Sequence, residues 1–336
     1  MQPINEIQDL EELLSKPDER SASDLAGIEG EVLVLGAGGK MGPTLCRLLR
    51  RATGRTVYAV SRYSDQSVRS RLEEDGVRTV QADLLDPSSY DRIPEAANVY
   101  FLAGMKFGAS AQEARTWAMN VYMPALVSRR YAGSRIVALS TGNVYPFVSV
   151  EGGGATEATT PDPVGEYAQS CLGRERIFQH FSGESGTPVA LIRLNYANEP
   201  RYGIIVDITQ KILAGEPVDL TMGYANLIWQ GDANNLIARA VTLAASPPVV
   251  LNVTGAETVS VRKLAERIGA LVDRKVRFEG SESPTALLSD ASACFRSLGR
   301  PEVSLDEMTE AIVGWVAAGN PVLGKPTKFQ VRDGKF

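Results

Sequence analysis

The chain has 336 residues, of which 44% are hydrophobic and 22% charged, and its formal net charge is −5. This composition is sufficient for one large packed domain or for two interlocked ones. The acidic balance argues against nucleic acid as a partner. The sequence contains neither a polybasic segment nor an apolar run of about 18 residues, so no membrane partner is expected.

Cysteine and histidine are too sparse to predict a metal site. Cys46, Cys171 and Cys294 lie far apart in the sequence, and His180 is the single histidine. We therefore expect no metal centre, and any acid–base chemistry must use other side chains. An odd, sparse set of cysteines, together with an acidic N-terminus unlike a signal peptide, predicts a cytoplasmic protein.

The predicted elements alternate between short apolar runs and helical patterns. A first helix is expected at about residues 4–15, and helical patterns follow at 43–52 and 111–132. The apolar runs predict buried strands at residues 31–35, 56–60, 77–82, 98–103 and 135–140. Strands that alternate with helices predict βαβ units, and hence an α/β fold with a doubly wound parallel sheet covered on both faces.

After about residue 196 the pattern loosens. Helices are predicted at 207–215 and 261–272, and short strands at 249–253 and 275–278. This later part is expected to add a sheet edge and a smaller cap. Ligands of open α/β sheets bind outside the carboxyl ends of the strands, so the cap and the sheet should meet at the site.

A glycine-rich loop, GAGGKMG, directly follows the first predicted strand and precedes a helix. Gly36, Gly39 and Gly42 have the spacing that allows a tight turn and a close approach of the backbone to a pyrophosphate. The helix N-terminus then offers free N–H groups to the phosphates. We expect this loop, including Lys40 and Met41, to bind a dinucleotide. The alternative is a turn that packs helix on strand without a ligand.

The second and third strands each end in a candidate cofactor contact. The second is followed by Arg62, with no acidic residue that could bind a ribose hydroxyl pair, and an arginine there favours the 2′-phosphate of NADP over NAD. Asp83 ends the third strand and is placed to meet the adenine. The alternatives are a surface arginine at 62 and a carboxylate at 83 that caps the next turn.

From about residue 30 to 270, the sequence resembles the extended short-chain dehydrogenase/reductase superfamily, the NAD-dependent epimerases and dehydratases. The resemblance depends on the motifs GAGGKMG, QADLLD, FLAG, MNVYMPAL, LSTGNVYP, EYAQSCLGRE, LIRLN, GDANNLIARAV and LNVTGAETVSVRKLAERIG. It implies a Rossmann-like sheet that holds NAD or NADP, with further cofactor contacts from Leu84, Ala103 and Gly104. It also implies three parts of the chain: an N-terminal helical extension (1–28), the NAD(P)-binding domain (29–195) and a mainly substrate-binding cap (196–336), from which about residues 225–255 return to the sheet.

The resemblance also implies the catalytic residues. Thr141 matches the Ser/Thr that orients the reacting oxygen, and Tyr167 matches the tyrosine that exchanges a proton with it. The family's lysine, four residues after the tyrosine, is replaced by Cys171. Because a phenol has a pKa near 10, as a base it needs a nearby cation. Lys106, after the fourth strand, is the favoured replacement, and Arg174 is the weaker candidate.

Two departures from the family point to the substrate. Gly142 and Asn143 stand where dehydratases carry Asp-Glu, so dehydration is not expected. Ala225 and Asn226 stand near the position of an arginine that grips a nucleotide diphosphate. The sequence therefore favours an oxidoreductase or epimerase acting on a free sugar, sugar acid or related polyhydroxylated substrate over a nucleotide-sugar epimerase.

Candidate substrate contacts are Asn143, Asn195 and Arg201. A second class of function also stays open, a non-catalytic NAD(P)-binding sensor or partner-binding protein, because the lysine is missing. From the resemblance we expect a homodimer that pairs through the two long helices, at about residues 110–130 and 166–182. The basic C-terminal segment, residues 325–336, is either a lid, a docking segment or a surface tail.

Overall fold

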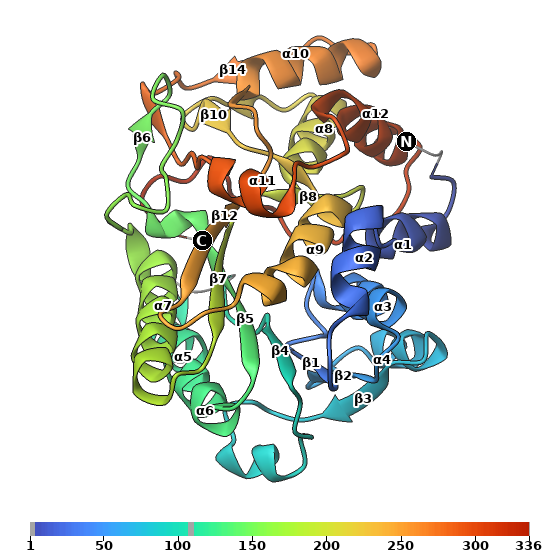
Figure 1. Ribbon diagram of the computed structural model, residues 1–336. Helices are drawn as coiled ribbons and strands as arrows, with labels where there is room; N and C mark the ends of the chain where they lie inside the picture. The colour runs from blue at the N-terminus through green and yellow to red at the C-terminus, as the bar shows by residue number, and fades with distance from the viewer. Residues whose placement is uncertain (1–3, 107–110, 336) are drawn as a thin grey trace.

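The computed structural model describes residues 4–106 and 111–335. Within them, seven parallel strands form the central sheet, in the order β12-β7-β5-β4-β1-β2-β3 (Figure 1). The strands are β1 (Val32–Leu35), β2 (Val57–Ser61), β3 (Arg78–Gln81), β4 (Asn98–Phe101), β5 (Arg135–Thr141), β7 (Val189–Leu194) and β12 (Val249–Val253). The predicted α/β fold with a doubly wound parallel sheet is thereby confirmed. Residues 107, 108 and 110, part of the expected loop and helix after β4, lie outside the described residues.

The inner strands are mainly apolar because both faces of the sheet are covered, whereas the edge strand β3 is polar and partly exposed. In β1, Val32 and Val34 pack into one hydrophobic cluster, and Leu33 and Leu35 pack into another on the opposite face. Successive side chains of a strand point to opposite faces, so a strand buried on both sides needs a continuous apolar run. This is the pattern from which the strands were predicted.

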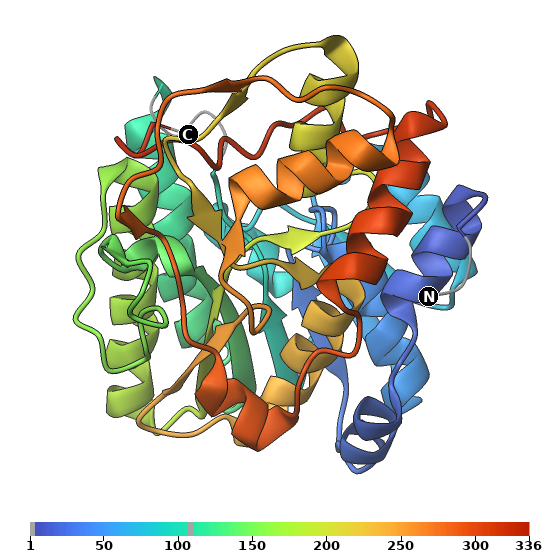
Figure 2. The ribbon, with the colours of Figure 1, turned by 90° about the horizontal axis from the view of Figure 1, so that it is seen from above.

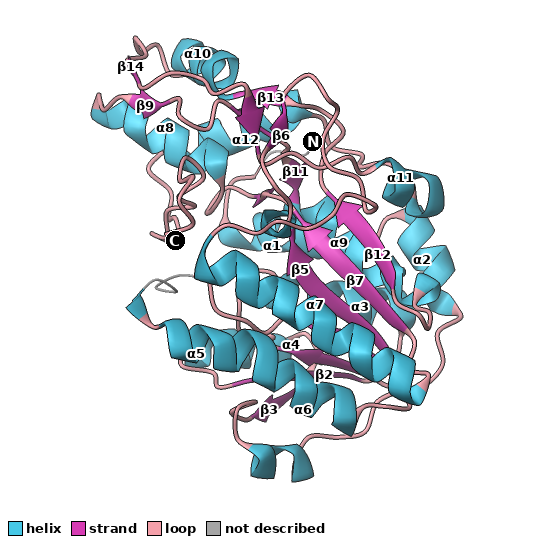
Figure 3. Cartoon of the chain, turned by 90° about the vertical axis from the view of Figure 1, so that its left-hand side faces the viewer, coloured by secondary structure: helices cyan, strands magenta, loops and turns pink. Residues whose placement is uncertain are grey.

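Helices cover the two faces as separate layers (Figure 3). The face that includes Val34 is covered by α3 (Gly42–Thr53), α4 (Gln66–Glu74) and α9 (Gln230–Arg239). The other face is covered by α6 (Met123–Arg130) and α7 (Gly165–Ser185), with α5 (Glu113–Trp117) and a π-helical turn (Ala118–Tyr122) leading into α6. Short 3-10 turns are Pro87–Asp91, Gly142–Val144 and Ala240–Leu243.

A cap with its own hydrophobic cluster lies across the carboxyl ends of the strands. Its helices are α8 (Ile204–Ala214), α10 (Val261–Leu271) and α12 (Leu305–Ala317), and α11 (Ser292–Leu298) connects it back to the sheet. Figure 2 shows α10 and α12, in orange and red, crossing above the sheet. Four short ladders join its loops: β6 (Val148–Ser149) with β15 (Thr285–Ala286), β8 (Ala197–Asn198) with β11 (Ile228–Trp229), β9 (Val218–Asp219) with β14 (Phe278–Glu279), and β10 (Tyr224–Ala225) with β13 (Val259–Ser260).

The N-terminal region forms two helices, α1 (Ile7–Ser15) and α2 (Glu19–Ala26), that pack beside α3 and α9. Asn234 of α9 donates a hydrogen bond to the carbonyl oxygen of Leu14 at 2.9 Å, and Arg51 of α3 forms an ion pair with Glu12 at 2.6 Å. These contacts fix the extension to the sheet domain. Within the described part of the chain, no helix has the length and apolarity needed to cross a membrane.

Candidate active site at the carboxyl ends of the strands

The glycine loop connects β1 to α3, and two of its glycines are required for packing alone. At Gly36, whose φ is +89°, an added Cβ would lie 2.6 Å from the amide nitrogen of Ala103, and at Gly42 it would overlap the carbonyl group of Ala37. At Gly39, which is exposed, the nearest atom would be the carbonyl oxygen of Gly36, at 3.3 Å. The crowding at Gly39 is milder than at Gly36 and Gly42, and the approach of a phosphate to the backbone would also favour glycine there.

Lys40 and Met41 leave this loop in different directions. Met41 stands at the N-cap of α3 and packs against the core of the sheet domain. Lys40 extends toward the cap, where its Nζ donates to the carbonyl oxygen of Ala197 at 2.5 Å and lies 4.1 Å from the centroid of the Tyr202 ring. Burial lowers the pKa of Lys40 to about 7, and the carboxylate of Glu199 acts in the opposite direction. Lys40 therefore ties the glycine loop to the segment after β7.

Arg62 lies next to the glycine loop, at the end of β2. Ser61 is directly under Gly38, because a Cβ added there would lie 2.5 Å from Ser61 Oγ. The carbonyl oxygen of Arg62 accepts a hydrogen bond from Gln81 Nε2 at 2.9 Å, and its side chain is exposed. The backbone at Arg62 is thus fixed against the end of β3 while its guanidinium stays accessible beside the loop.

The other predicted cofactor contacts also lie on loops that follow strands. Asp83 Oδ1 accepts the amide of Leu85 at 3.0 Å, so this carboxylate caps its own turn, as the alternative interpretation supposed, and it is also exposed. Leu84 is buried beneath it. Ala103 and Gly104 follow β4, where Ala103 is buried against Gly36 and Gly104 is exposed.

Thr141 and Tyr167 meet at the carboxyl end of β5. The hydroxyl of Tyr167 is hydrogen-bonded to the side chains of Thr141 and Cys171. Burial raises the pKa of Tyr167 well above its ordinary value and the Cys171 thiol adds to this effect, whereas Arg174 and the Thr141 hydrogen bond lower the pKa. Burial also raises the pKa of Cys171, so this side chain is a protonated thiol at neutral pH.

Both candidate cations come near Tyr167. Lys106 Nζ lies 5.9 Å from the centroid of the Tyr167 ring and donates to the carbonyl oxygen of Thr327 at 3.5 Å. Burial lowers the pKa of Lys106 to about 8. Arg174 is buried on the same helix as Tyr167, and its Nη1 donates to the carbonyl oxygen of Leu139 at 2.6 Å. The candidate that looked weaker in the sequence is thus also close to the site.

Asn143 and Asn195 lie on opposite sides of Gly142. Thr141 Oγ1 donates to Asn143 Oδ1 at 3.1 Å and accepts the backbone amide of Asn143 at 3.2 Å. Asn195 is buried, donates to Ser289 Oγ at 3.0 Å, and occupies the space that a Cβ at Gly142 would need. Glycine at 142, where dehydratases carry an acid, is therefore required by the packing of Asn195.

Arg201 is engaged by carboxylates. Its Nε lies 3.1 Å from Glu199 Oε2, and its Nη1 lies 3.4 Å from Glu11 Oε1 on α1. The charge of Arg201 is therefore balanced within the protein, and the contact joins the N-terminal helix to the segment that follows β7.

A buried polar network below the site was not recognised in the sequence. Arg193 of β7 forms a two-point ion pair with Glu175 of α7, at 2.7 and 3.0 Å, and donates to Tyr145 Oη at 2.8 Å. Tyr145 Oη donates to Asn252 Oδ1 at 2.8 Å, and Ser140 Oγ donates to Glu175 at 2.5 Å. The network fixes α7 to three strands. A pattern search could not find it, because its members are far apart in the chain and individually unremarkable.

The C-terminal segment, residues 325–335, crosses the mouth of the site. Thr327 donates from its backbone amide and its hydroxyl to Asp207 Oδ2, at 2.8 and 2.6 Å, and Phe329 is buried in the cap. Arg332 donates to the carbonyl oxygen of Thr285 at 2.8 Å. The segment is therefore held by the cap over most of its length.

The end of this segment contacts the start of α7 (Figure 3). Gly165 and Gly334 have φ values of +83° and +74°, and a Cβ added to either would lie within 2.7 Å of the other's Cα. Between the segment and the site is a cavity of about 10 Å³, roughly the space of one water molecule. It is lined by Asn143, Tyr145, Phe147, Val164, Leu287, Val331, Arg332 and Gly334.

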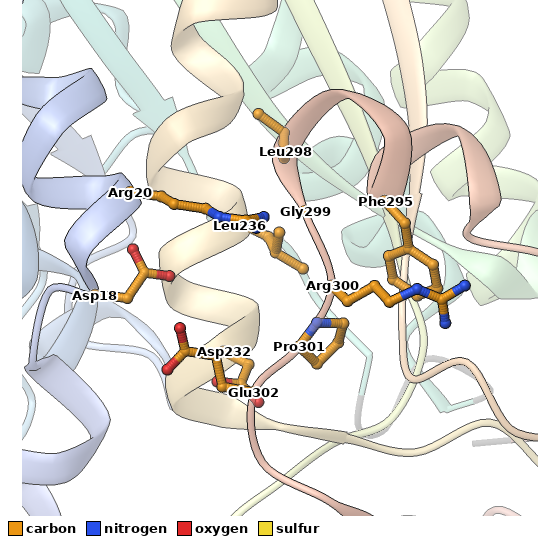
Figure 4. A pocket seen from close by; sticks show the side chains of 10 residues that line it. All are labelled: Asp18, Arg20, Asp232, Leu236, Phe295, Leu298, Gly299, Arg300, Pro301 and Glu302. Carbon is orange, nitrogen blue, oxygen red and sulfur yellow. The ribbon is translucent and has the colours of Figure 1, made fainter.

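A separate cavity of about 260 Å³ lies between α2, α9 and residues 295–302 (Figure 4). Burial, together with the charges of Glu302 and Asp18, raises the pKa of Asp232 in its wall to about 6. None of the predicted site residues lines it. Within residues 4–106 and 111–335, no group of three His, Cys, Asp or Glu side chains is arranged to hold a metal ion.

Three solved structures share this architecture at low sequence identity. MoeE5 in complex with UDP-glucose and NAD is 21% identical, with a TM-score of 0.72 over 86% of this chain and 99% of that one. The UDP-glucuronic acid 4-epimerase of Bacillus cereus in complex with UDP-glucuronic acid and NAD is 17% identical, with a TM-score of 0.73 over 86% and 99% of the two chains. The dTDP-glucose 4,6-dehydratase of Streptomyces venezuelae, with NAD and TYD bound, is 19% identical, with a TM-score of 0.74 over 86% and 97%. At these identities the likeness establishes the fold.

No curated protein matches the sequence. The model of the NAD dependent epimerase/dehydratase family matches residues 32–224, which include the glycine loop, Thr141 and Tyr167. Because this match spans more than half of the chain, the protein belongs to the NAD dependent epimerase/dehydratase family.

Proposed function

We propose that the protein is an NAD(P)-dependent oxidoreductase or epimerase that acts on a sugar, sugar acid or related polyhydroxylated substrate. The observation that carries this proposal is the Thr141–Tyr167 hydroxyl pair at the carboxyl end of β5. A retained hydroxyl pair of this kind favours turnover, whereas a sensor would need only the glycine loop.

The residues present fit a dinucleotide. Gly39 is exposed just before α3, where a side chain would obstruct an approaching phosphate, and the helix N-terminus attracts phosphate. The loops after β2, β3 and β4 would supply Arg62, Asp83 and Gly104 along the rest of the cofactor. When bound, NAD or NADP would accept or donate the hydride.

The chain's own side chains would handle the proton. Thr141, fixed by its two contacts with Asn143, would orient the reacting oxygen by donating or accepting a hydrogen bond. Tyr167 would give a proton to a carbonyl oxygen or take one from a hydroxyl. Its raised pKa favours the protonated phenol, so Tyr167 can donate a proton without further help. To accept a proton from the substrate, Tyr167 must first ionise, and this needs a neighbouring positive charge. Lys106, 5.9 Å from the ring centroid, is one such charge.

Two features support a substrate smaller than a nucleotide sugar, although MoeE5 and the Bacillus cereus epimerase are described with UDP-sugars. Asn226, near the position of the family's pyrophosphate-binding arginine, is uncharged and buried, and donates to the carbonyl oxygen of Glu257 at 2.9 Å. The C-terminal segment also covers the mouth of the site. A diphosphate would lose a cationic anchor and would compete with Arg332 and its neighbours for space.

The cofactor proposal favours NADP, because Arg62 is exposed and directly follows Ser61, which lies under Gly38 of the glycine loop. Arg62→Ala should weaken binding of NADP about tenfold or more, and that of NAD only slightly, since the lost contact is to the 2′-phosphate. Calorimetric titration with both cofactors tests this. Equal losses for the two would show that Arg62 does not recognise the 2′-phosphate.

The function itself is tested by incubating the purified protein with NAD or NADP and a panel of sugars, sugar acids, polyols and UDP-sugars. Cofactor absorbance reports net oxidation or reduction, and NMR of the sugar reports epimerisation. We expect turnover with a substrate that lacks a nucleotide, and its loss in Tyr167→Phe. Tight dinucleotide binding without turnover on any member of the panel would favour the non-catalytic alternative. Turnover confined to UDP-sugars would contradict the proposed substrate class.

A further inference from the structure

Arg174 is a buried arginine with no carboxylate partner among the residues that the structure describes. Its Nη1 donates to the carbonyl oxygen of Leu139 at 2.6 Å and its Nη2 to Asn120 Oδ1 at 2.6 Å, both uncharged groups. Its Nε is buried without a hydrogen-bond partner. An unbalanced charge in a protein interior is costly, and a residue in this state is retained where its charge is used.

Helix spacing places Arg174 on the same side of α7 as Tyr167. Residues 167, 171 and 174 are separated by four and three positions, so they occupy one stripe along α7. The family's lysine would stand at 171, and Arg174 is the next residue on the same stripe with a longer side chain. It reaches back toward the loop after β4, where a Cβ added to Gly104 would overlap its Nη2. Glycine at 104 therefore leaves room for the guanidinium beside the expected cofactor site.

The other charged and titratable groups described around Tyr167 do not supply a positive charge that persists at every pH. Cys171, on the same helix, is a neutral thiol because burial raises its pKa. Glu175 also lies on α7, but its carboxylate is engaged by Arg193. From the loop after β4, Lys106 faces the ring of Tyr167, and burial lowers its pKa to about 8. A guanidinium stays charged at every pH at which the protein is folded, whereas Lys106 loses its charge in the mildly alkaline range.

We propose that Arg174 is the positioning residue that supplies Tyr167 with the permanent positive charge of the family's missing lysine. This inference rests on the proposed function, because it assigns a charge to the proton-exchanging group of that reaction. The inference can nevertheless be tested separately from that function, because the ionisation of a phenol at position 167 can be measured without any substrate.

The experiment replaces Tyr167 by a difluorinated tyrosine in the full-length chain, and records its ionisation by fluorine NMR as a function of pH. The fluorinated phenol is much more acidic than tyrosine, so its titration falls where the protein is folded. With Arg174→Met the midpoint should rise by about one pH unit or more, because a fixed positive charge near the phenolate has been removed. Arg174→Lys should keep most of the original midpoint.

Arg176→Met is the matched control, since Arg176 is exposed on the same helix and hydrogen-bonded to Gln179. It should leave the midpoint unchanged. If Arg174→Met does not fold, Gly104→Ala tests the same point by displacing the guanidinium without deleting it, and should also raise the midpoint. Adding Cys171→Lys to Arg174→Met should lower it again, because the family's own cation is restored.

An unchanged midpoint in folded Arg174→Met, or in folded Gly104→Ala, would overturn the inference. The failure of the proposed function would look different, since no substrate would be turned over while the midpoint of the fluorinated residue still responded to Arg174. Where a substrate is found, the pH–rate profile of Arg174→Met should move upward with the midpoint, whereas a purely structural role would lower the rate at every pH equally.

Discussion

Tyr167 is shaped by neighbours on several elements: Thr141 on β5, Cys171 and Arg174 on its own helix, and Lys106 on the loop after β4. Burial favours the neutral phenol, and the charge of Arg174 opposes burial. The balance decides whether the residue can accept a proton as well as donate one. Because Cys171 stands four residues after Tyr167, we expect the positive charge to come from another residue while the hydroxyl pair is kept.

We expect Tyr167→Phe to reduce kcat about a hundredfold or more, because the group that exchanges the proton is removed. Lys106→Met should reduce kcat to a smaller extent and shift the pH optimum upward. Cys171→Ala should leave turnover nearly unchanged, since a buried thiol contributes mainly packing. Steady-state kinetics across pH distinguish the three. Loss of turnover in Cys171→Ala with a silent Lys106→Met would show that the thiol has a chemical role.

Gly39 offers a test of the cofactor site that separates binding from folding. Gly39→Val places a branched side chain at an exposed position near the start of α3, so the protein should fold while dinucleotide binding is lost. Circular dichroism and calorimetric titration measure the two properties. Gly36→Val is the comparison, because it would overlap the loop after β4 and should fail to fold. Unchanged affinity in folded Gly39→Val would contradict the dinucleotide site.

At the scale of elements, the C-terminal segment contacts both the cap and α7. It is held at one end by Thr327 on Asp207 and at the other by the contact of Gly334 with Gly165. Gly334 therefore contacts the first residue of α7, Gly165. Any substrate that enters through this mouth must pass the segment or displace it.

Gly334→Ala should detach the end of the segment from α7, because the added Cβ would lie 2.7 Å from the Cα of Gly165 and the backbone has a positive φ. We expect KM for the substrate to change at least severalfold, with global stability lowered by about 1 kcal/mol or less. Kinetics and urea unfolding measure these effects. Gly319→Ala, also at a positive φ but with no atom near its Cβ, is the control.

Strands and turns could be predicted from the sequence where their structure depends on residues that are adjacent in the chain. Strands buried on both faces need continuous apolar runs, and the turn at Gly36 needs a residue that accepts a positive φ, so both leave a signal in the sequence. The resemblance, with Cys171 four residues after Tyr167, predicted that the family's lysine is absent. Arg174 was undervalued, because its approach to Gly104 depends on how α7 packs on the loop after β4. The contact of Gly334 with Gly165 joins residues 169 positions apart, and no periodicity reports it. The interruption of helix 111–132 by a π-helical turn was also missed, since its side-chain pattern is that of a continuous helix.

For the whole molecule, two half-buried lysines make stability depend on pH. Burial lowers the pKa of Lys40 to about 7 and of Lys106 to about 8, whereas in the unfolded chain both ionise near 10.5. Between the folded-state and unfolded-state pKa values, the unfolded chain binds more protons than the folded chain. The free energy of unfolding therefore rises with pH in this range. We expect a rise of about 2 kcal/mol between about pH 7 and 8.5 in urea unfolding. The rise should be smaller in Lys40→Met, and an equal rise in that variant would exclude Lys40 as its source.

The expected homodimer would pair through the helices on the outer face of the sheet domain, α5 to α7. Trp117 and Tyr122, on α5 and the turn that follows, are 38% and 50% exposed, and Gly173 of α7 packs closely against Val121. Light scattering should give about twice the chain mass of 36.2 kDa, and Tyr122→Glu should shift the population to monomers by placing a charge in an apolar contact. A wild-type mass near 36.2 kDa at micromolar concentration would rule this dimer out.

The contact between Gly334 and Gly165 has a practical consequence for anyone who purifies the protein. A peptide fused after residue 336 would begin three residues beyond Gly334, which contacts the start of α7. An affinity tag at that end would crowd the mouth of the site and perturb any measured activity. A tag at the opposite terminus would precede α1, whose contacts lie with α3 and α9. We therefore expect a tag before α1 to preserve more activity in a substrate screen than a tag after residue 336.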